Sequence, residues 1–314
     1  AISRRGLRGE RVLVFFSTSS DEAELYEITC RNGKCERTVL KSYTAPAITT
    51  AVGITSILND VKRFAPAPTY AMTIGCHGMG WVPVEAGRSR VASDFKYHWE
   101  TEDGPLTRFF GGTVEDYQTN VTTLAEAIAN AGMHMDFILF DDCYMATVEV
   151  AYDLRHVTDY LIASTCEMMA VGMPYDLIGE YLLESDYKAV CDGFYDFYSV
   201  YSTPCGTLSV TDCSQLDVMA ELMREINSRY TYTGRAEDEL QDLDGYRPTI
   251  FYDFADYVRH LCKDETLLAE YEALLARTVI YEVHTDEYFT VLSSAGTDGR
   301  GTYPIYTTCG LTIS

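Results

Sequence analysis

The sequence lacks several features that mark common classes of protein. No run of about 18 apolar residues occurs, so we expect nothing in the chain to span a membrane. No Cys-x-x-Cys pair occurs, which disfavours a metal site or a thioredoxin-type redox site. No glycine-rich phosphate loop follows a strand-like run, which argues against a nucleotide-binding protein.

Basic residues are scarce. The chain has 24 Lys and Arg against 47 Asp and Glu, a formal net charge of -23. A phosphate backbone would be repelled by this charge, so we expect no nucleic-acid partner. The same charge mildly favours cationic ligands through long-range attraction.

The 10 cysteines are too few for a disulfide scaffold in a chain of 314 residues. Cys30 and Cys35 flank an Asn-Gly turn between two strand-like runs, where they could form a disulfide or remain independent thiols. The N-terminal AISRRGLRGERVLVFF has no apolar core long enough for a signal peptide. A signal could already have been removed, so secretion stays open.

Strand and helix patterns alternate along the first half of the chain. Residues 11–18 read as a buried strand, and two alternating runs around the Asn-Gly turn read as a hairpin. From Tyr70 to Thr165 apolar strands alternate with helical patterns, which is typical of a parallel sheet covered by helices. Helical patterns dominate from Tyr187 to about Ala276.

The fold prediction is therefore an α/β protein with a mostly parallel central sheet, helices on both faces and a helical C-terminal extension. No linker marks a second domain, so we expect residues 1–314 to form one domain, with a core at about 11–183 and additions at about 184–314.

A histidine and a cysteine follow two of the predicted strands. His77 comes directly after YAMTIGC, and Cys143 comes directly after FILFDD. Ligands of open α/β sheets bind where parallel strands end, so both side chains could meet there over a substrate. A thiol and an imidazole in that position suit nucleophilic acyl transfer. We also expect Cys143 to open a helix, whose N-terminus would lower the thiol pKa.

These two segments resemble a known family. The order of apolar strand, His-Gly, helix, apolar strand and Asp-x-Cys is similar to the caspase–haemoglobinase group of cysteine peptidases. Within that group, FILFDDCYMATVEVAYDLRHVTDYLIAS and HGMGW resemble the clostripain family. The resemblance implies a caspase-like fold and a cysteine endopeptidase that cuts after Arg or Lys.

The resemblance also implies roles for individual residues. His77 would be the general acid and base, Cys143 the nucleophile, and the backbone N–H groups of Gly78 and Cys143 the oxyanion hole. Asp141, two residues before the nucleophile, would pair with a basic side chain of the substrate. Asp142 competes for that role. Alternation along a strand sends the two carboxylates to opposite faces, so we assign Asp141 to the pocket and Asp142 to a helix N-cap.

Two positions depart from the family pattern. Cys76 precedes the histidine where relatives usually have a polar residue, and this thiol could be oxidised with the dyad or could simply pack. Met173 replaces a tryptophan in CEMMAVGMPY, a loop that helps to build the pocket in relatives. These departures motivate an alternative: a catalytically weak or inactive binding or scaffold protein with the same fold. A thiol-dependent redox protein is a weaker alternative.

Relatives are often made as inactive chains and cut in the loop after the histidine. Here that loop contains EAGRSRV, so we expect self-cleavage after Arg90 or Arg88. The resemblance implies no required cofactor, a possible response to calcium, and substrates that are peptides or proteins with basic residues. No Asp-x-Asp-x-Asp-Gly loop occurs, so no metal ligands are assigned. It also implies a bacterial protein that is secreted or held at the cell envelope.

Overall fold

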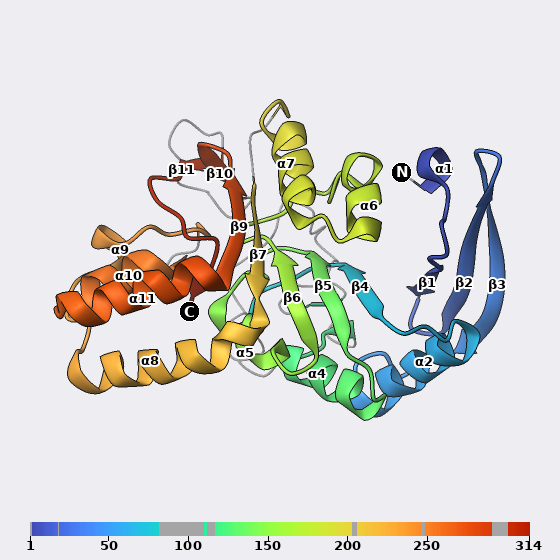
Figure 1. Cartoon of the computed structure of the whole chain (residues 1–314), viewed down its shortest axis with the longest axis horizontal. Helices are drawn as coiled ribbons and strands as arrows, with labels where there is room; N and C mark the ends of the chain where they lie inside the picture. Colours follow the sequence, from blue (N-terminus) through green and yellow to red (C-terminus); the bar gives the residue numbers. More distant parts are fainter. Residues whose placement is uncertain are drawn as a thin grey trace, which may run out of the picture.

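A five-stranded sheet in the order β4-β5-β6-β7-β9 forms the centre of the structure (Figure 1). The structure is a computed structural model that describes residues 2–17, 19–81, 110–111, 117–202, 206–245, 249–290 and 301–314. The strands of this sheet are β4 (Tyr70–Gly75), β5 (Met135–Asp141), β6 (Thr158–Ala163), β7 (Thr207–Asp212) and β9 (Val279–His284).

The strand directions confirm the prediction of a mostly parallel sheet. β4, β5 and β6 pair in parallel, whereas β7 is antiparallel to both of its neighbours, β6 and β9. Four of the five strands therefore run in one direction. The antiparallel strand β7 was not expected from the sequence, because its apolar run fits a buried strand of either direction.

Helices cover both faces of this sheet, as predicted. Side chains alternate along β5, so Ile138 and Phe140 enter one core while Phe137 and Leu139 enter the other. The second core is closed by α6 (Tyr175–Glu184) and α7 (Tyr187–Tyr198), which Figure 1 shows together on one side of the sheet. The first is closed by α2 (Ala51–Phe64), α4 (Val121–Asn130), α5 (Val148–Leu154), α8 (Leu216–Arg229), α10 (Phe254–Leu261) and α11 (Glu265–Thr278).

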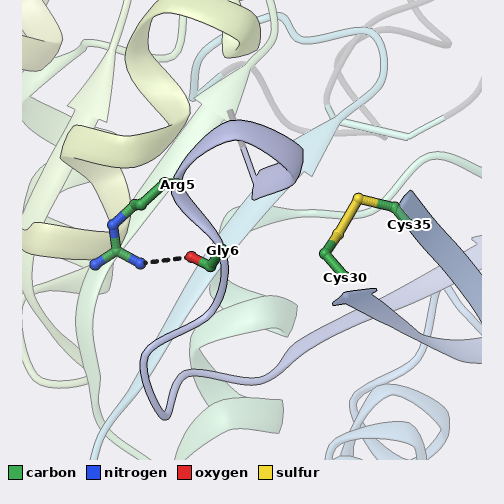
Figure 2. Close-up of a disulfide and its surroundings, with 4 residues drawn as sticks. All are labelled: Arg5, Gly6, Cys30 and Cys35. Atoms are coloured by element: carbon green, nitrogen blue, oxygen red, sulfur yellow. Dashed lines mark hydrogen bonds between the residues drawn. A yellow bond between two sulfur atoms is a disulfide. The ribbon is translucent and has the colours of Figure 1, made fainter. Parts of the chain in front are cut away.

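A separate three-stranded antiparallel sheet lies beyond β4 (Figure 1). It consists of β1 (Val12–Ser17), β2 (Glu22–Arg31) and β3 (Lys34–Thr44). The predicted hairpin is confirmed: Asn32 and Gly33 both have positive φ, and Cys30 and Cys35 form a disulfide (Figure 2). The prediction that residues 11–18 form a buried strand is wrong. β1 pairs along its length with β2 in this small sheet and stays half-buried or exposed.

The N-terminal segment is fastened by a short helix, α1 (Ile2–Arg5). The Arg5 guanidinium donates to the carboxylates of Glu10 and Glu184 at 2.7 and 3.0 Å, and to the Gly6 carbonyl (Figure 2). Because Glu184 ends α6, this ion pair links the N-terminal segment to the central unit.

The C-terminal part combines helices with short strand pairs, in line with the expected extension. Its remaining elements are η2 (Cys213–Gln215), α9 (Ala236–Glu239), β8 (Tyr252–Asp253), β10 (Glu287–Phe289), β11 (Thr302–Pro304) and β12 (Thr312–Ile313). β12 pairs with β8, and the Thr312 backbone N–H donates to the Ala146 carbonyl at 2.9 Å. The chain end therefore supports the segment that follows Cys143. Among the described residues, no helix has both the length and the apolar character needed to cross a bilayer.

Candidate active site

The pairing of β4 with β5 places His77 and Cys143 at the same edge of the sheet. Gly75 at the end of β4 lies opposite Asp141 at the end of β5 in a parallel pair. His77 and Cys143 each follow two residues later. The prediction that two distant segments bring these side chains to one edge therefore agrees with the observed register.

Gly78 is where the two segments touch. A Cβ atom at this position would lie 2.6 Å from the Cys143 carbonyl oxygen, 2.8 Å from Asp142 Cβ and 2.9 Å from Met145 Sδ. Carbon atoms do not approach backbone so closely, so only glycine fits. The neighbour that leaves no room for a side chain at Gly78 is the segment that carries Cys143.

Cys143 lies in a turn rather than at a helix N-terminus, which corrects the prediction. α5 begins at Val148, and its N-cap is Thr147, whose hydroxyl accepts from the Val150 N–H at 3.1 Å. The intervening backbone instead runs beside the segment after β6, where the Ala146 N–H donates to the Ser164 carbonyl. This pairing, absent from any local sequence signal, keeps the helix from starting earlier.

The thiol of Cys143 is half-buried and is held by backbone. The Met168 N–H donates to Sγ at 3.2 Å. Burial, followed by the nearby Glu167 carboxylate, raises the pKa of this thiol well above its ordinary value. The expected lowering of the thiol pKa by a helix N-terminus is therefore wrong for this structure, because the helix begins too late and a carboxylate lies close.

Tyr144 fixes the turn that carries Cys143. Its φ of 61° is uncommon for a residue with a side chain and costs of order 1–3 kcal/mol, so neighbouring contacts must hold it. The ring stacks on Phe251 with centroids 5.4 Å apart, and the hydroxyl lies 3.3 Å from a Glu167 carboxylate oxygen and from the Asp244 carbonyl. Glu167, Asp244 and Phe251 were not predicted as supports of Cys143, because no local sequence signal connects them to it.

His77 is held through its main chain. Its backbone N–H and carbonyl exchange hydrogen bonds with Gly111 at 3.1 and 3.0 Å. The side chain is half-buried, and burial lowers the pKa of the imidazole. The neutral ring is therefore favoured near neutral pH.

Asp141, the residue predicted to lie in a substrate pocket, contacts the loop of residues 166–175. The Met173 N–H donates to its carboxylate at 2.8 Å, and a Cβ at Gly172 would lie 2.8 Å from a carboxylate oxygen. Tyr175 forms a further hydrogen bond, while burial raises the pKa of the Asp141 carboxyl. This hydrogen bond comes from the backbone of residue 173. It therefore does not depend on whether that residue is methionine, as here, or tryptophan, as in relatives.

Asp142 is not a helix N-cap, which corrects the second assignment. Its side chain is 1% exposed, and the N-cap of α5 is Thr147. One carboxylate oxygen accepts from the Cys76 N–H at 2.5 Å, and the other lies 3.4 Å from the Cys76 sulfur. The two aspartates have different partners, as expected from alternation, but the buried Asp142 contacts Cys76, the residue after β4, instead of a helix.

The expected cleavage positions Arg88 and Arg90 lie outside the described residues. Within the described ranges, no group of three or more His, Cys, Asp or Glu side chains could hold a metal ion. The last described residue before the gap is Trp81, whose indole N–H donates to Asp153 at 2.8 Å.

A cysteine and a histidine at one edge of a helix-covered, mostly parallel sheet define a caspase-like cysteine peptidase. Comparison with known proteins narrows this class. The sequence model of the clostripain family, Peptidase_C11, matches residues 5–287, so the chain belongs to the clostripain family of cysteine peptidases. A search of curated proteins gives no match.

Solved structures agree with this assignment. A secreted C11 cysteine protease from Bacteroides thetaiotaomicron, "iotapain", is 52% identical over 100% of this chain and 85% of its own, with a TM-score of 0.89. A clostripain from the same species, in complex with the peptide inhibitor BTN-VLTK-AOMK, is 54% identical over 66% of this chain and 90% of its own, with a TM-score of 0.62. An inactive zymogen C11 protease from Parabacteroides distasonis is 26% identical over 99% of this chain and 83% of its own, with a TM-score of 0.79.

Proposed function

We propose that this peptidase cleaves peptide bonds after Arg or Lys, with Cys143 as nucleophile and His77 as general acid and base. The observation that carries the proposal is the register of β4 and β5, together with the contact between Gly78 and the Cys143 backbone. These features bring a thiol and an imidazole to the edge where a substrate carbonyl could lie between them.

Both side chains favour their neutral forms at rest. Burial raises the pKa of the Cys143 thiol and lowers the pKa of the His77 imidazole. The thiol proton therefore passes to the imidazole as Sγ attacks the carbonyl, rather than in a preformed ion pair. The carbonyl oxygen becomes an oxyanion, which the backbone N–H groups of Gly78 and Cys143 would stabilise.

The tetrahedral intermediate then collapses to a thioester. The C–N bond breaks, and the imidazolium donates its proton to the departing amine. A water molecule, deprotonated by the neutral His77, attacks the thioester and releases the carboxylic acid and the free thiol.

Asp141 would select the basic residue before the cleaved bond. Its carboxylate is partly desolvated at the base of the 166–175 loop, where a guanidinium or ammonium group could pair with it strongly. The clostripain relative binds an inhibitor whose peptide letters, VLTK, end in lysine beside the AOMK group. That relative supports the same preference here.

A panel of short fluorogenic peptides tests this proposal. The peptides differ only in the residue before the reporter amide, and they are assayed with the wild type and with Cys143→Ala. We expect Arg and Lys to dominate and turnover to fall by about 10³-fold or more in the variant. Turnover that survives the substitution would remove Cys143 from the mechanism, and a preference for Asp or Asn would remove Asp141 from the pocket.

We further propose that the peptidase activates itself by cleavage after Arg90 or Arg88. The proposal is supported by the sequence EAGRSRV and by the relative described as an inactive zymogen. Mass spectrometry during incubation should show two fragments in the wild type and an intact chain in Cys143→Ala. An intact wild-type chain that is fully active would contradict self-cleavage.

Export to an oxidising compartment is a further part of the proposal. One relative is described as secreted, and a Cys30–Cys35 disulfide persists best outside the cytosol. Thiol counting on protein isolated from its natural host, without reductant, should find this pair oxidised; two free thiols there would oppose the idea.

A further inference from the structure

The residue directly before His77 contacts the residue directly before Cys143. Cys76 precedes His77 and Asp142 precedes Cys143. The Asp142 carboxylate accepts the Cys76 backbone N–H at 2.5 Å through one oxygen, and the Cys76 thiol lies 3.4 Å from the other. This pair of contacts joins the two strands just beyond their last paired residues, Gly75 and Asp141.

A third segment joins the same contacts. The Gly111 N–H lies 3.1 Å from the Cys76 sulfur and 3.0 Å from the His77 carbonyl oxygen. The sulfur therefore accepts from Gly111 while its own proton points to Asp142. A Cβ at Gly111 would lie 1.9 Å from the Tyr117 carbonyl oxygen, so only glycine fits at this position.

We propose that Asp142 and Cys76 form a positioning brace that sets the separation of His77 from Cys143, and that this brace responds to pH through Asp142. The proposal rests on the proposed function. Neither residue needs to touch the substrate, because each acts through its neighbour in the chain. In this chain a cysteine stands directly before His77 and an aspartate directly before Cys143.

Burial of a carboxyl group between two strands disfavours its ionised form. Burial raises the pKa of Asp142 to about 7, although its hydrogen bonds from Cys76 act in the opposite direction. Near neutral pH the group therefore changes charge. The ionised carboxylate accepts strong hydrogen bonds from both the N–H and the S–H of Cys76. The protonated carboxyl accepts weaker hydrogen bonds from these groups.

Several other titratable groups lie around Asp142. Cys76 faces it from the end of β4, and burial together with Asp142 raises the pKa of that thiol. Asp141 and Cys143 flank it on its own segment, and its charge adds to the raised pKa values of Cys143 and Tyr175. His77 titrates below its usual value, because burial lowers its pKa. The pKa of Asp142 is about 7, so a transition of the rate near that pH that is lost in Asp142→Asn would be assigned to this carboxyl.

The stability of the fold should move in the opposite direction from activity. Because the folded-state pKa of Asp142 exceeds the ordinary 3.8, the folded protein binds this proton more tightly than the unfolded chain does. The stability that protonation contributes is complete at low pH and is lost as pH rises towards 7. A purely structural carboxyl would give this pH-dependent stability without a matching change in rate.

The molecule contains a matched control pair. Asp253, 0% exposed in β8, accepts the N–H of Cys309 at 2.7 Å and of Asp256 at 2.8 Å, and burial raises its pKa. It thus has the same chemistry as Asp142 and the same type of cysteine partner. Its contacts lie in the β8–β12 region rather than at the ends of β4 and β5.

The test compares Asp142→Asn with Asp253→Asn on an arginyl fluorogenic peptide from about pH 5.5 to about pH 9. We expect Asp142→Asn to lower kcat by about 10-fold, to change KM less than about 2-fold, and to lose the transition near 7. Asp253→Asn should lower the melting temperature yet keep the wild-type profile. An unchanged profile in Asp142→Asn, or the same change in both variants, would overturn the proposal.

A second pair of variants covers the case in which Asp142→Asn does not fold. Cys76→Ser keeps a donor for the carboxylate, whereas Cys76→Ala removes it. We expect Cys76→Ser to retain kcat within about 3-fold and Cys76→Ala to lose about 10-fold with KM unchanged. Equal kcat in these two variants would contradict the brace.

Failure of the proposed function remains distinguishable from failure of the brace. If the wild type cleaves no basic peptide, the rate at which iodoacetamide alkylates Cys143 still reports on Asp142. This rate should lose its component near pH 7 in Asp142→Asn and keep it in Asp253→Asn. Identical alkylation profiles in the wild type and Asp142→Asn would reject the brace independently of turnover.

Discussion

The edge of the central sheet that carries His77 and Cys143 and the three-stranded sheet β1–β3 are built in different ways. At the edge, residues from the ends of β4 and β5, the 166–175 loop and the segment near Phe251 meet within hydrogen-bonding or van der Waals distance. In the β1–β3 sheet, each strand pairs with its neighbour in the chain, and one local disulfide closes the turn.

This difference predicts where the molecule tolerates change. An edge assembled from distant segments has several tight backbone approaches, and a shift of one segment displaces the reacting groups. A sheet made of local hairpins can lose one contact without moving the edge. Substitutions should therefore reduce activity strongly at the edge and weakly in β1–β3.

Apart from replacement of Cys143 itself, the largest effect should come from Gly78→Ala. The added methyl group would lie 2.6 Å from the Cys143 carbonyl oxygen, so one of the two segments must move. We expect kcat/KM on an arginyl peptide to fall by about 10²-fold or more. Gly75→Ala is the control, because its Cβ would lie 3.9 Å from the nearest atom, Asp141 Cβ. Similar losses in both variants would contradict a specific role for the Gly78 contact.

Asp141→Asn should have a large effect that depends on the substrate. With an arginyl or lysyl peptide, kcat/KM should fall by about 10²-fold, because the basic group loses its partner charge. With a norleucyl peptide it should change little. Asp136→Asn, at the opposite end of β5, serves as a control on the same strand. A uniform loss across all three peptides would indicate a structural role for Asp141 instead.

The pH dependence of KM should show a moderate effect of the same carboxylate. Burial raises the pKa of Asp141, so acidification protonates it sooner than an exposed aspartate. KM for the arginyl peptide should therefore rise several-fold as pH falls, since the neutral acid no longer pairs with the cation. The norleucyl peptide and the Asp141→Asn variant should lack this rise in steady-state measurements. A parallel rise with both peptides would assign the titration elsewhere.

The smallest effect on activity should come from the double substitution Cys30→Ser, Cys35→Ser. It opens a short loop in β1–β3, so the free energy of unfolding should fall by about 2 kcal/mol or less. Activity should stay within about 2-fold of the wild type. Thermal unfolding and an arginyl peptide assay on the same preparation check both values. A loss of activity as large as that of Gly78→Ala would show that the two regions are coupled.

The features that were predictable from sequence are those with local signals. The Asn32–Gly33 hairpin, the strands that end before His77 and Cys143, and the glycine at position 78 all have such signals. The N-cap assignment of Asp142 was wrong because the backbone after Cys143 pairs with Ser164. No residue near Cys143 in the sequence indicates this pairing.

The supports of the edge were missed for the same reason. Phe251 is far from Tyr144 in the chain, yet it holds the turn that carries the thiol. The pKa of the Cys143 thiol is raised rather than lowered, because burial and the nearby Glu167 carboxylate both disfavour the thiolate. Both causes depend on tertiary packing, which the local sequence does not show. The buried strand expected at 11–18 failed because an apolar run does not specify which sheet it joins.

The central claim is that His77 and Cys143 act together on one substrate carbonyl. It is tested most directly with a lysine-terminated peptidyl acyloxymethyl ketone, followed by peptide mapping of the labelled chain. We expect one thioether, on Cys143, with labelling slowed by about 10²-fold or more in His77→Ala and absent in Cys143→Ala. Labelling of another residue such as Cys76, or equal rates in the wild type and His77→Ala, would contradict the account.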